Sequence, residues 1–422
     1  MTESFNSTEC LGSVLRHLEF LKNMDNGWNH RLLYTDAWNM AMDELESWML
    51  SGNMKTRRDA LGNLYGRIEG RSDKTVLLLS HYDSVESGGS YDGALGVIAG
   101  LAVLDTLFLK YGTPEHNIEL LAVCDEDGGR FKSSFLGSRA ITGEISYEEI
   151  EGLTDAAGLS FNAARERAGL APIDEEILKS CKRSDILCAF ELHAEQGRKL
   201  YDSGIPAGIV KTITGQYKIK AEFTGEANHA GTTTMQDRQD ALVAAAELVG
   251  FVQQLARQSG CDSVGTVGVL EVRPGATNII PDKAMLIADL RCPQSEVLLN
   301  MGCSFEKKCN ELALKNGLRM HIEYLCRQMP VPMDECLTGL SREIAEELNI
   351  PYLDMFSGAG HDIQIISSIA PGAMIFVQSE RGISHSPEEY TDAASIKIGM
   401  DILGEAVYRT AYKTCSQVSH SI

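Results

Sequence analysis

Short runs of mostly apolar residues mark the first half of the chain. Residues 75–80 and 117–124 are two such runs, and their pattern is typical of parallel strands buried on both faces of a sheet. Residues 93–110 between them form a longer apolar segment, which Asp105 and several glycines interrupt. It is too short and too broken to span a bilayer, so it predicts a buried helix. The order strand, helix, strand predicts an α/β sheet with right-handed crossovers.

The pattern changes after residue 210, where apolar and polar residues begin to alternate. Residues 216–224 alternate as a half-exposed antiparallel strand does. Further strands are predicted at 264–272 and 284–290, with helices at 238–256 and 295–315. A helix, a buried strand and a helix then follow at 339–348, 373–378 and 393–412. The sequence therefore predicts an inserted α+β domain over residues 210–326, within a discontinuous domain of residues 1–209 and 327–422.

Ionisable side chains directly follow both buried strands that are predicted in the first half. His81 follows the first strand, and Asp125, Glu126 and Asp127 follow the second. In open α/β sheets, functional groups gather at the carboxyl ends of the strands. We therefore expect these side chains to lie close together.

The formal net charge of the 422-residue chain is −21. A field of this sign repels phosphate backbones and anionic membranes, so we expect no nucleic-acid or membrane partner. It also opposes an anionic substrate, which would need a local Arg, His or metal ion. The 11 cysteines are scattered without a C-x-x-C pair, and residues 1–10 lack a signal-peptide pattern. We therefore expect a reduced, cytoplasmic protein.

Five short motifs supply the side chains of a dinuclear metal site. Taken singly, each is explained as well by a core histidine, a solvated acidic pair or a glycine turn. Two divalent ions about 3.5–4 Å apart need a bridging carboxylate, a further carboxylate and imidazoles. A carboxylate that is not a ligand must deprotonate the attacking water. Together the motifs offer five ligands and one base, which are His81, Asp92, Asp127, His193, His385 and the base Glu126.

Taken together, these motifs resemble the hydantoinase/carbamoylase amidases, within the larger clan of aminoacylase and carboxypeptidase-G-like metallohydrolases. The resemblance extends over nearly the whole chain, from Trp48 and residues 59–64 to residues 389–391. It implies an α/β, aminopeptidase-like di-metal domain with a mixed sheet flanked by helices, and a smaller inserted lid or dimerisation domain. It also implies two divalent ions per chain, and Zn²⁺, Mn²⁺, Co²⁺ and Ni²⁺ all suit mixed His and carboxylate ligands.

The resemblance also implies a role for each residue of this set. Asp92 corresponds to the carboxylate that bridges both ions, His81 and His193 to ligands of one ion, and Asp127 and His385 to ligands of the other. Glu126 corresponds to the general base that later protonates the leaving nitrogen. Asp83 corresponds to the carboxylate that orients the imidazole of His81.

Asp127 departs from the family pattern, which usually has Glu at this position. The carboxylate of Asp reaches about 1.4 Å less far, the length of one bond, so the second ion would be held more loosely unless the backbone moves closer. Asp125 is the alternative candidate for the same ligand position, in a match shifted along the chain. The residues that follow, Gly128-Gly129-Arg130-Phe131, favour Asp127.

The inserted domain contains Asn228-His229-Ala230-Gly231-Thr232-Thr233. This resembles a family motif whose histidine polarises the scissile carbonyl and stabilises the oxyanion. In relatives, that histidine belongs to the neighbouring subunit of a homodimer. Thr234 replaces the usual proline. Without the other motifs, a turn histidine would explain His229 equally well.

Five further positions match substrate contacts of the family. Asn278 and Arg291 correspond to residues that bind the substrate carboxylate, a task that suits the planar fork of arginine. Gln216 corresponds to another polar contact. Gly358 and His361 belong to a loop that contacts substrate in relatives, and a plain glycine-rich loop is the alternative for it.

The implied activity is hydrolysis of an N-carbamoyl-L-amino acid to the amino acid, CO2 and ammonia, by attack of a metal-bridging hydroxide. Allantoate also carries one carboxylate and ureido groups, so an allantoate amidohydrolase is the first alternative. An aminoacylase or dipeptidase of the same clan is the second. A non-catalytic binding protein with a degenerate site is an alternative of another class, and Asp127 and Thr234 would be its early signs.

Overall fold

The computed structural model describes residues 5–24 and 30–413, and the chain divides into two compact units. Unit 1 comprises Met1–Lys211, Met333–Met355 and His361–Ile422, and unit 2 comprises Thr212–Pro332 and Phe356–Gly360. The insert predicted from the sequence covers residues 210–326 and leaves out residues 327–332 and the short segment Phe356–Gly360. This segment joins unit 2 because its carbonyl groups accept hydrogen bonds there, including one from the backbone N–H of Thr214 to Ser357 at 2.9 Å.

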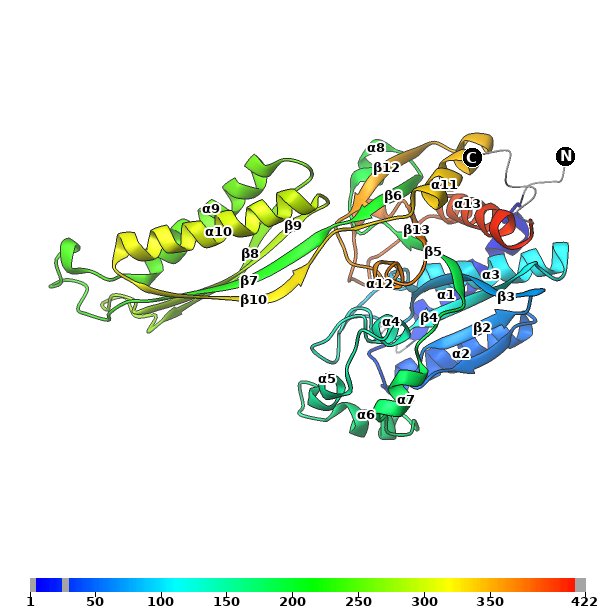
Figure 1. The fold of residues 1–422 in the computed structure, drawn as a ribbon, viewed down its shortest axis with the longest axis horizontal. Coiled ribbons are helices and arrows are strands. Elements are labelled where there is room, and N and C mark those ends of the chain that lie inside the picture. The colour runs from blue at the N-terminus through cyan, green and yellow to red at the C-terminus, as the bar shows by residue number, and fades with distance from the viewer. Residues whose placement is uncertain (1–4, 25–29, 414–422) are drawn as a thin grey trace. The chain divides into compact units, whose positions relative to one another are not determined.

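The larger sheet is mixed and has the order β1-β2-β4-β3-β5-β13-β6-β11, with β12 paired to β6 (Figure 1). Strands β4, β3, β5 and β13 run parallel, whereas β1, β2, β6 and β11 pair antiparallel. The strands are β1 (Lys55–Arg58), β2 (Leu64–Ile68), β3 (Ser72–His81), β4 (His116–Val123), β5 (Ile186–Ala194), β6 (Ala207–Ile213), β11 (Val331–Pro332), β12 (Tyr352–Ser357) and β13 (Gly372–Val377).

The parallel strands are buried on both faces, as their mostly apolar runs predict. Successive residues of β3, β5 and β13 are buried, so helices or loops cover both faces of the sheet. The helices of unit 1 are α1 (Thr8–Asn23), α2 (Asp36–Ser51), α3 (Ala94–Tyr111), α4 (Leu136–Thr142), α5 (Tyr147–Gly152), α6 (Phe161–Arg167), α7 (Glu175–Ser180), α8 (Lys199–Ser203), α11 (Glu335–Glu347), α12 (Asp362–Ile366), η3 (Glu380–Gly382) and α13 (Ala393–Ala411). The predicted α/β class with a mixed sheet is confirmed.

Helix α3 is the buried helix that the sequence predicts between β3 and β4. By length and composition it is long and apolar enough to cross a membrane, so the expectation that this segment is too short and too broken to do so is wrong. However, 61% of the helix is buried inside the protein. It contacts β3, β4 and β5 as well as α1 and α13. Its hydrophobicity is therefore explained by its place in the core of unit 1.

Unit 2 is a four-stranded antiparallel sheet with the order β10-β7-β9-β8 and two long helices. Its elements are β7 (Gly215–Thr224), η2 (Met235–Asp237), α9 (Ala241–Ser259), β8 (Val264–Arg273), β9 (Lys283–Cys292), α10 (Ser295–Asn316) and β10 (Arg319–Gln328). Alternate residues of β7 and β9 are buried and form one apolar core with α9 and α10. The alternation predicted at residues 216–224 is thereby confirmed.

The register of this sheet shows which residues lie at each of its two ends. Gln216 pairs with Arg291 at one end of β7 and β9, and Thr224 pairs with Lys283 at the other. Arg291 and Lys283 are eight residues apart (291 − 283), which corresponds to about 26 Å of extended strand. Any side chain near Lys283 is therefore remote from Arg291 within the same unit.

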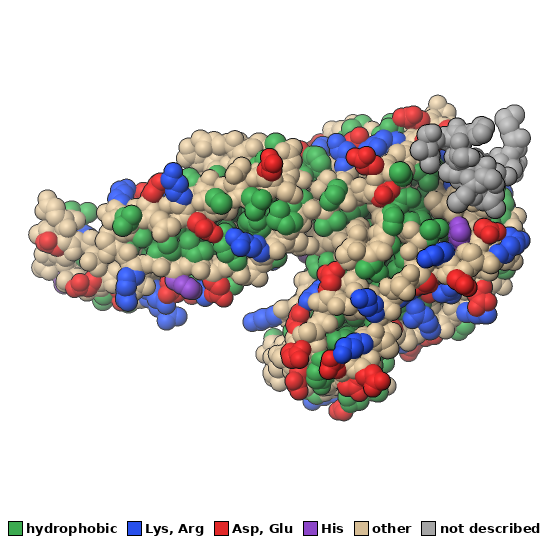
Figure 2. All heavy atoms as spheres, viewed as in Figure 1, with side chains coloured by type: hydrophobic (Ala, Val, Ile, Leu, Met, Phe, Trp, Pro, Cys, Tyr) green, Lys and Arg blue, Asp and Glu red, His purple; other side chains and the backbone are tan. Residues whose placement is uncertain are grey.

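Several elements have no clear signal in the sequence. The helices α4 to α7 are six or seven residues each, too short to establish a helical period. On the face drawn in Figure 2, Lys and Arg side chains of the described residues are interspersed with Asp and Glu. The cysteines of the described chain are all free thiols.

Candidate functional site

The carboxyl ends of the parallel strands bring the predicted metal ligands together. His81 is the last residue of β3, and His193 is the penultimate residue of β5. Residues 125–127 follow β4, and His385 lies in the loop between η3 and α13. Asp92 comes just before the first turn of α3. Because β3, β4, β5 and β13 are parallel, these segments meet at one edge of the sheet.

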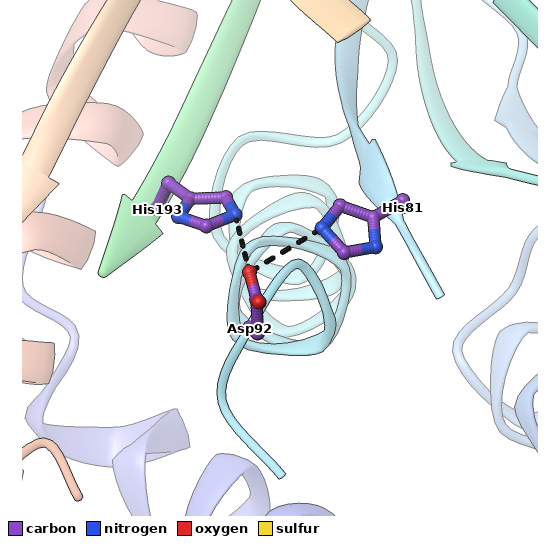
Figure 3. A group of neighbouring side chains, drawn as sticks. All are labelled: His81, Asp92 and His193. Atoms are coloured by element: carbon purple, nitrogen blue, oxygen red, sulfur yellow. Dashed lines mark ion pairs between the residues drawn. The ribbon is translucent and has the colours of Figure 1, made fainter. Parts of the chain in front are cut away.

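His81, Asp92 and His193 form a buried group in which both imidazoles face one carboxylate oxygen (Figure 3). Oδ1 of Asp92 is 3.5 Å from Nε2 of His81 and 3.3 Å from Nε2 of His193. Gly93 makes this approach possible, since a Cβ atom there would lie 2.3 Å from the His81 ring. Gly93 also has a φ of +62°, which favours glycine.

Hydrogen bonds to backbone carbonyl groups determine which ring nitrogen of each of these two imidazoles carries the proton. Nδ1 of His193 lies 2.8 Å from the carbonyl oxygen of Ala194, and Nδ1 of His81 lies 3.3 Å from that of Asp83. A carbonyl oxygen can only accept, so both Nδ1 atoms donate. In the neutral rings, both Nε2 atoms then carry lone pairs, the form in which histidine binds a metal ion, and the Nε2 of His193 accepts the backbone N–H of Gly93 at 3.1 Å.

The second oxygen of Asp92 belongs to a second group, made with Asp127 and His385. Nε2 of His385 is 3.1 Å from Oδ2 of Asp92 and 3.5 Å from Oδ1 of Asp127. His385 is 48% exposed at its side chain, whereas both histidines of the first group are buried. The two groups therefore share one carboxylate, and the second group is open to solvent.

The side chains present fit two divalent cations. Two ligand atoms of a tetrahedral ion at about 2.0–2.1 Å lie about 3.3–3.4 Å from each other, close to the separations in the first group. Oδ1 of Asp92 is buried without a hydrogen-bond partner among the described residues, as expected of an oxygen that a cation contacts. The donor set of these two groups, three imidazoles and two carboxylates, matches borderline metals such as Zn²⁺ and Mn²⁺.

Burial and neighbouring charges shift the pKa values of the ionisable groups of the centre. Burial raises the pKa of Glu126 well above its usual range, and His81 only partly opposes this while Asp127 and Asp92 add to it. Burial lowers the pKa of His81, but Asp92, Glu126 and Asp127 outweigh it and hold that pKa well above the usual range. The concentrated negative charge thus favours a bound cation.

Glu126 and Asp83 lie where a base and an orienting carboxylate are expected. Glu126 forms a group with His81 and Asp127 whose ligand atoms lie within 4.8 Å of one another. Oδ1 of Asp83 accepts a hydrogen bond from the backbone N–H of Glu126 at 3.3 Å and lies 3.8 Å from Nδ1 of His81. Asp83 therefore contacts both the ligand and the backbone that carries the base.

The structure places Asp127, and not Asp125, beside the other ligands. Asp125 is buried, has a φ of +56°, and takes part in none of the candidate ligand groups of the described chain. The left-handed backbone at Asp125 reverses the chain directly after β4. The next two side chains, Glu126 and Asp127, then join His81 in a candidate group.

His361 lies beneath the first group and not at the surface. It is buried, and its ring centroid is 4.6 Å from that of His193. Glu191 belongs with both histidines to a further group of possible ligand atoms. Both oxygens of Glu191 already accept hydrogen bonds, from the Ser80 hydroxyl at 2.9 Å and the Ile363 N–H at 3.0 Å. His361 is thus placed to support His193 by packing.

Three side chains that were not predicted from the sequence contact the centre, namely Gln196, Ser384 and Glu389. Nε2 of Gln196 donates to Oδ2 of Asp92 at 3.1 Å and to the Ser384 hydroxyl at 3.0 Å. Glu389 is buried and accepts hydrogen bonds from the backbone of both ligand loops. Burial and the charge of Asp92 raise the pKa of Glu389 to about 7. Their nearness to His193 and His385 in the sequence is the signal that could have identified them.

In unit 2, Arg291 is held by Asp289 and Gly358, and Gln216 in turn holds Asp289. Asp289 pairs with it side-on, with Oδ1 at 3.1 Å from Nε and Oδ2 at 3.0 Å from Nη2. Nη1 donates to the carbonyl oxygen of Gly358 at 2.6 Å, and Gln216 donates to Asp289 at 2.7 Å. The structure therefore brings Gln216, Arg291 and Gly358 together. Because Nη1 and Nη2 carry two hydrogens each, each of them has a second N–H that can donate to another acceptor.

His229 and Asn278 form a separate pair on unit 2. Their segments are joined by the hydrogen bond from Ala230 N–H to the Asn278 carbonyl oxygen at 3.0 Å. Nδ1 of His229 accepts the N–H of Gly231 at 3.0 Å. In the neutral ring, the proton must then sit on Nε2, which becomes a donor. An exposed N–H donor is what an oxyanion needs.

Asn278 and Arg291 do not lie together within one chain. Asn278 belongs to the connection between β8 and β9, beyond Lys283, whereas Arg291 is near the other end of β9. Within one chain, these two residues are therefore too far apart to hold the same small carboxylate. The sequence could not show this, because the two residues are only 13 positions apart (291 − 278).

Comparisons with known proteins cover both units of the chain. The sequence profile of the peptidase family M20/M25/M40 matches residues 77–409. The Bacillus subtilis protein named allantoate amidohydrolase is 35% identical over 405 residues, which are 95% of this chain and 98% of that protein. The Geobacillus stearothermophilus protein named N-carbamoyl-L-amino acid amidohydrolase is 36% identical over 406 residues, 96% and 98% of the two chains. A crystal structure of an amidase of the hydantoinase/carbamoylase family from Burkholderia multivorans has a TM-score of 0.87 at 30% identity, over 97% of this chain and 99% of that one.

Proposed function

The chain belongs to the peptidase family M20/M25/M40, and we propose on this premise that it hydrolyses a C–N bond of a small N-carbamoyl-L-amino acid. The products are the amino acid, CO2 and ammonia. The observation that carries the proposal is the pair of ligand groups that share Asp92, with Glu126 beside them. The names of two relatives, which act on N-carbamoyl-L-amino acids and on allantoate, support a ureido substrate.

The residues of the centre would hold two divalent cations, the first with His81, Asp92 and His193 and the second with Asp92, Asp127 and His385. Such cations lower the pKa of a water molecule toward neutrality and polarise the scissile carbonyl group. Glu126 accepts the proton of the attacking water and then donates it to the departing nitrogen. Nε2–H of His229 donates to the carbonyl oxygen as it becomes negative.

The substrate carboxylate accepts the remaining N–H groups of Nη1 and Nη2 of Arg291. Asp289 holds the edge formed by Nε and Nη2, so the planar group is already oriented before substrate arrives. Arginine also supplies the local positive charge that an anion needs on a chain with a net charge of −21. This contact selects for an acid over an amide of the same shape.

The working form is a homodimer in which His229 and Asn278 act in the site of the neighbouring chain. Two observations support this. These two residues lie at the end of unit 2 opposite to Arg291, so one small substrate that contacts all three needs two chains. Strand β8 is the edge of its sheet, and its exposed residues include Val264, Val269 and Leu270, which another chain could cover.

Allantoate amidohydrolase activity is the second candidate, because a relative with that name is 35% identical over 95% of this chain. Allantoate carries one carboxylate, which Arg291 would bind equally well, and its ureido groups offer the same scissile bond. The residues described above therefore serve both substrates.

A substrate panel on metal-reconstituted protein tests the proposal. Full-length protein, stripped with a chelator and reloaded with Zn²⁺, Mn²⁺, Co²⁺ or Ni²⁺, is assayed for ammonia release from N-carbamoyl-L-amino acids and allantoate. N-acetyl amino acids and dipeptides serve as comparison substrates. We expect ureido substrates to be hydrolysed, with two ions per chain by elemental analysis, and activity to vanish after chelation. Turnover of N-acetyl amino acids alone, or a folded chain that binds no metal, would falsify the proposal.

Arg291→Lys is expected to raise KM for the carboxylate substrate about 10–100-fold while kcat changes less than about threefold. Lysine keeps the charge but loses the planar edge, and a hydrogen bond to a charged group contributes about 1.5–3 kcal/mol. Initial-rate kinetics measure both constants. Arg257→Lys, on the exposed side of α9, is the matched control. An unchanged KM in Arg291→Lys would rule out Arg291 as the carboxylate contact.

A further inference from the structure

We propose that Glu389 is a positioning residue that sets the separation between Asp92 and His385, and so controls the affinity of the second metal position. This inference rests on the proposed two-metal function. Glu389 touches neither substrate nor ion in that scheme. It acts through the backbone of two ligand loops that are nearly 300 residues apart in the sequence.

One buried carboxylate connects both loops. Oε2 of Glu389 accepts the backbone N–H groups of Tyr91 at 3.3 Å and Asp92 at 3.2 Å. Oε1 accepts the backbone N–H of His385 at 2.9 Å and the hydroxyl of Ser384 at 3.4 Å. Each oxygen therefore serves one loop, and the width of the carboxylate fixes the spacing between them.

The loop of His385 has a backbone conformation that needs support. His385 has a φ of +54°, a left-handed conformation that residues other than glycine rarely adopt. Such a conformation persists only where surrounding contacts hold it, and the hydrogen bond from the backbone N–H of His385 to Glu389 is a contact of this kind.

The carboxylate of Glu389 fits against Gly89 because glycine has no Cβ atom. A Cβ atom at Gly89 would lie 1.8 Å from Oε2 and 2.2 Å from Cδ of Glu389. Any larger residue at this position would push the carboxylate away from the N–H groups of Tyr91 and Asp92. Gly89 and Glu389 therefore form one functional pair.

The two metal positions depend on Glu389 to different degrees. The first uses His81 and His193, which are anchored on the buried strands β3 and β5. The second uses His385, which lies in a loop and is half exposed, and Asp127, which has a shorter reach than Glu. Loss of the Glu389 contacts should therefore weaken the second position far more than the first.

The test is Mn²⁺ binding to metal-stripped, full-length Glu389→Gln, followed by electron paramagnetic resonance and elemental analysis. Glutamine keeps the shape but turns one oxygen into an NH₂ group that faces N–H donors. We expect the second Mn²⁺ to bind about 10–100-fold more weakly, the usual effect of removing a partner of a ligand, and the first to change less than about threefold. The coupled two-Mn²⁺ signal should be lost at concentrations that saturate the wild type.

Glu405→Gln is the matched control, because Glu405 is a buried carboxylate that binds Phe5 N–H and Arg409 away from the centre. It should keep both Mn²⁺ affinities. Unchanged second-site affinity in Glu389→Gln, or an equal loss in Glu405→Gln, overturns the inference. A wild-type chain that binds fewer than two Mn²⁺ overturns the proposed function itself, and the inference with it.

Gly89→Ala provides a second route if Glu389→Gln does not fold. It should weaken the second Mn²⁺ position on its own, and its effect should shrink when it is combined with Glu389→Ala, because the clash partner is then mostly gone. Fully additive losses in this double-mutant cycle contradict the proposed coupling.

Discussion

Glu126→Gln should lower kcat about 10³-fold, within the 10²–10⁴-fold range of positioned acid–base groups, while two metal ions remain bound. Glutamine has the shape of glutamate but cannot accept the proton of the attacking water. Glu126 has no ligand role in the two groups that share Asp92, so metal content should be preserved. Single-turnover kinetics and elemental analysis on the same preparation measure the two quantities.

Glu405→Gln is the control for this prediction too, and it should retain wild-type kcat. A Glu126→Gln protein that is folded, carries two ions and turns over at a near-normal rate would show that another group is the base. Loss of both ions would instead show that Glu126 is a ligand, and the neighbouring Asp127 would then have to be reconsidered as the base.

His229→Ala should lower kcat about 10²–10³-fold, the effect of removing one donor to a developing oxyanion. Metal content and KM should change little, because His229 belongs to unit 2 and is proposed to act on charge that develops only during the reaction. His229→Gln, which keeps an N–H donor, should recover part of the loss. Equal kcat for wild type and His229→Ala would exclude this role.

Mixed dimers show whether His229 acts in the site of its own chain or in the site of its partner. A dimer of one Glu126→Gln chain and one His229→Ala chain has one intact site if His229 acts in the partner, and no intact site if it acts in its own chain. Co-expression with two affinity tags isolates this dimer. We expect about half of the wild-type activity, since one of two symmetric sites is complete. Activity no greater than that of the parent variants would contradict action across the dimer.

The same mixed-dimer experiment tests Asn278. Because Asn278 lies in the segment hydrogen-bonded to Ala230, it should act with His229. Asn278→Ala should therefore restore activity when mixed with Glu126→Gln, but not when mixed with His229→Ala. Activity in the mixture with His229→Ala, but not in the mixture with Glu126→Gln, would mean that Asn278 contributes to the site of its own chain.

The strand and helix pattern was predicted well because burial leaves a direct trace in the sequence. Strands β3, β4 and β13 are buried on both faces and have apolar runs, while β7 alternates because only one face is covered. The helices α4 to α7 left no such trace, since six or seven residues give too few turns for a period to appear. Strand β10 alternates in burial but was not identified.

The sequence by itself determined which chemical groups are present and that several follow parallel strands, because residue type and hydrophobic period are local properties. Only the tertiary structure decided that the two oxygens of Asp92 face different histidines, and that Glu389 connects loops that are remote in the sequence. The same holds for Arg291 and Asn278. They are close in sequence but separated by about 26 Å of strand, because an extended chain gains about 3.3 Å per residue. Distance in space follows from register and strand direction, which no single segment contains.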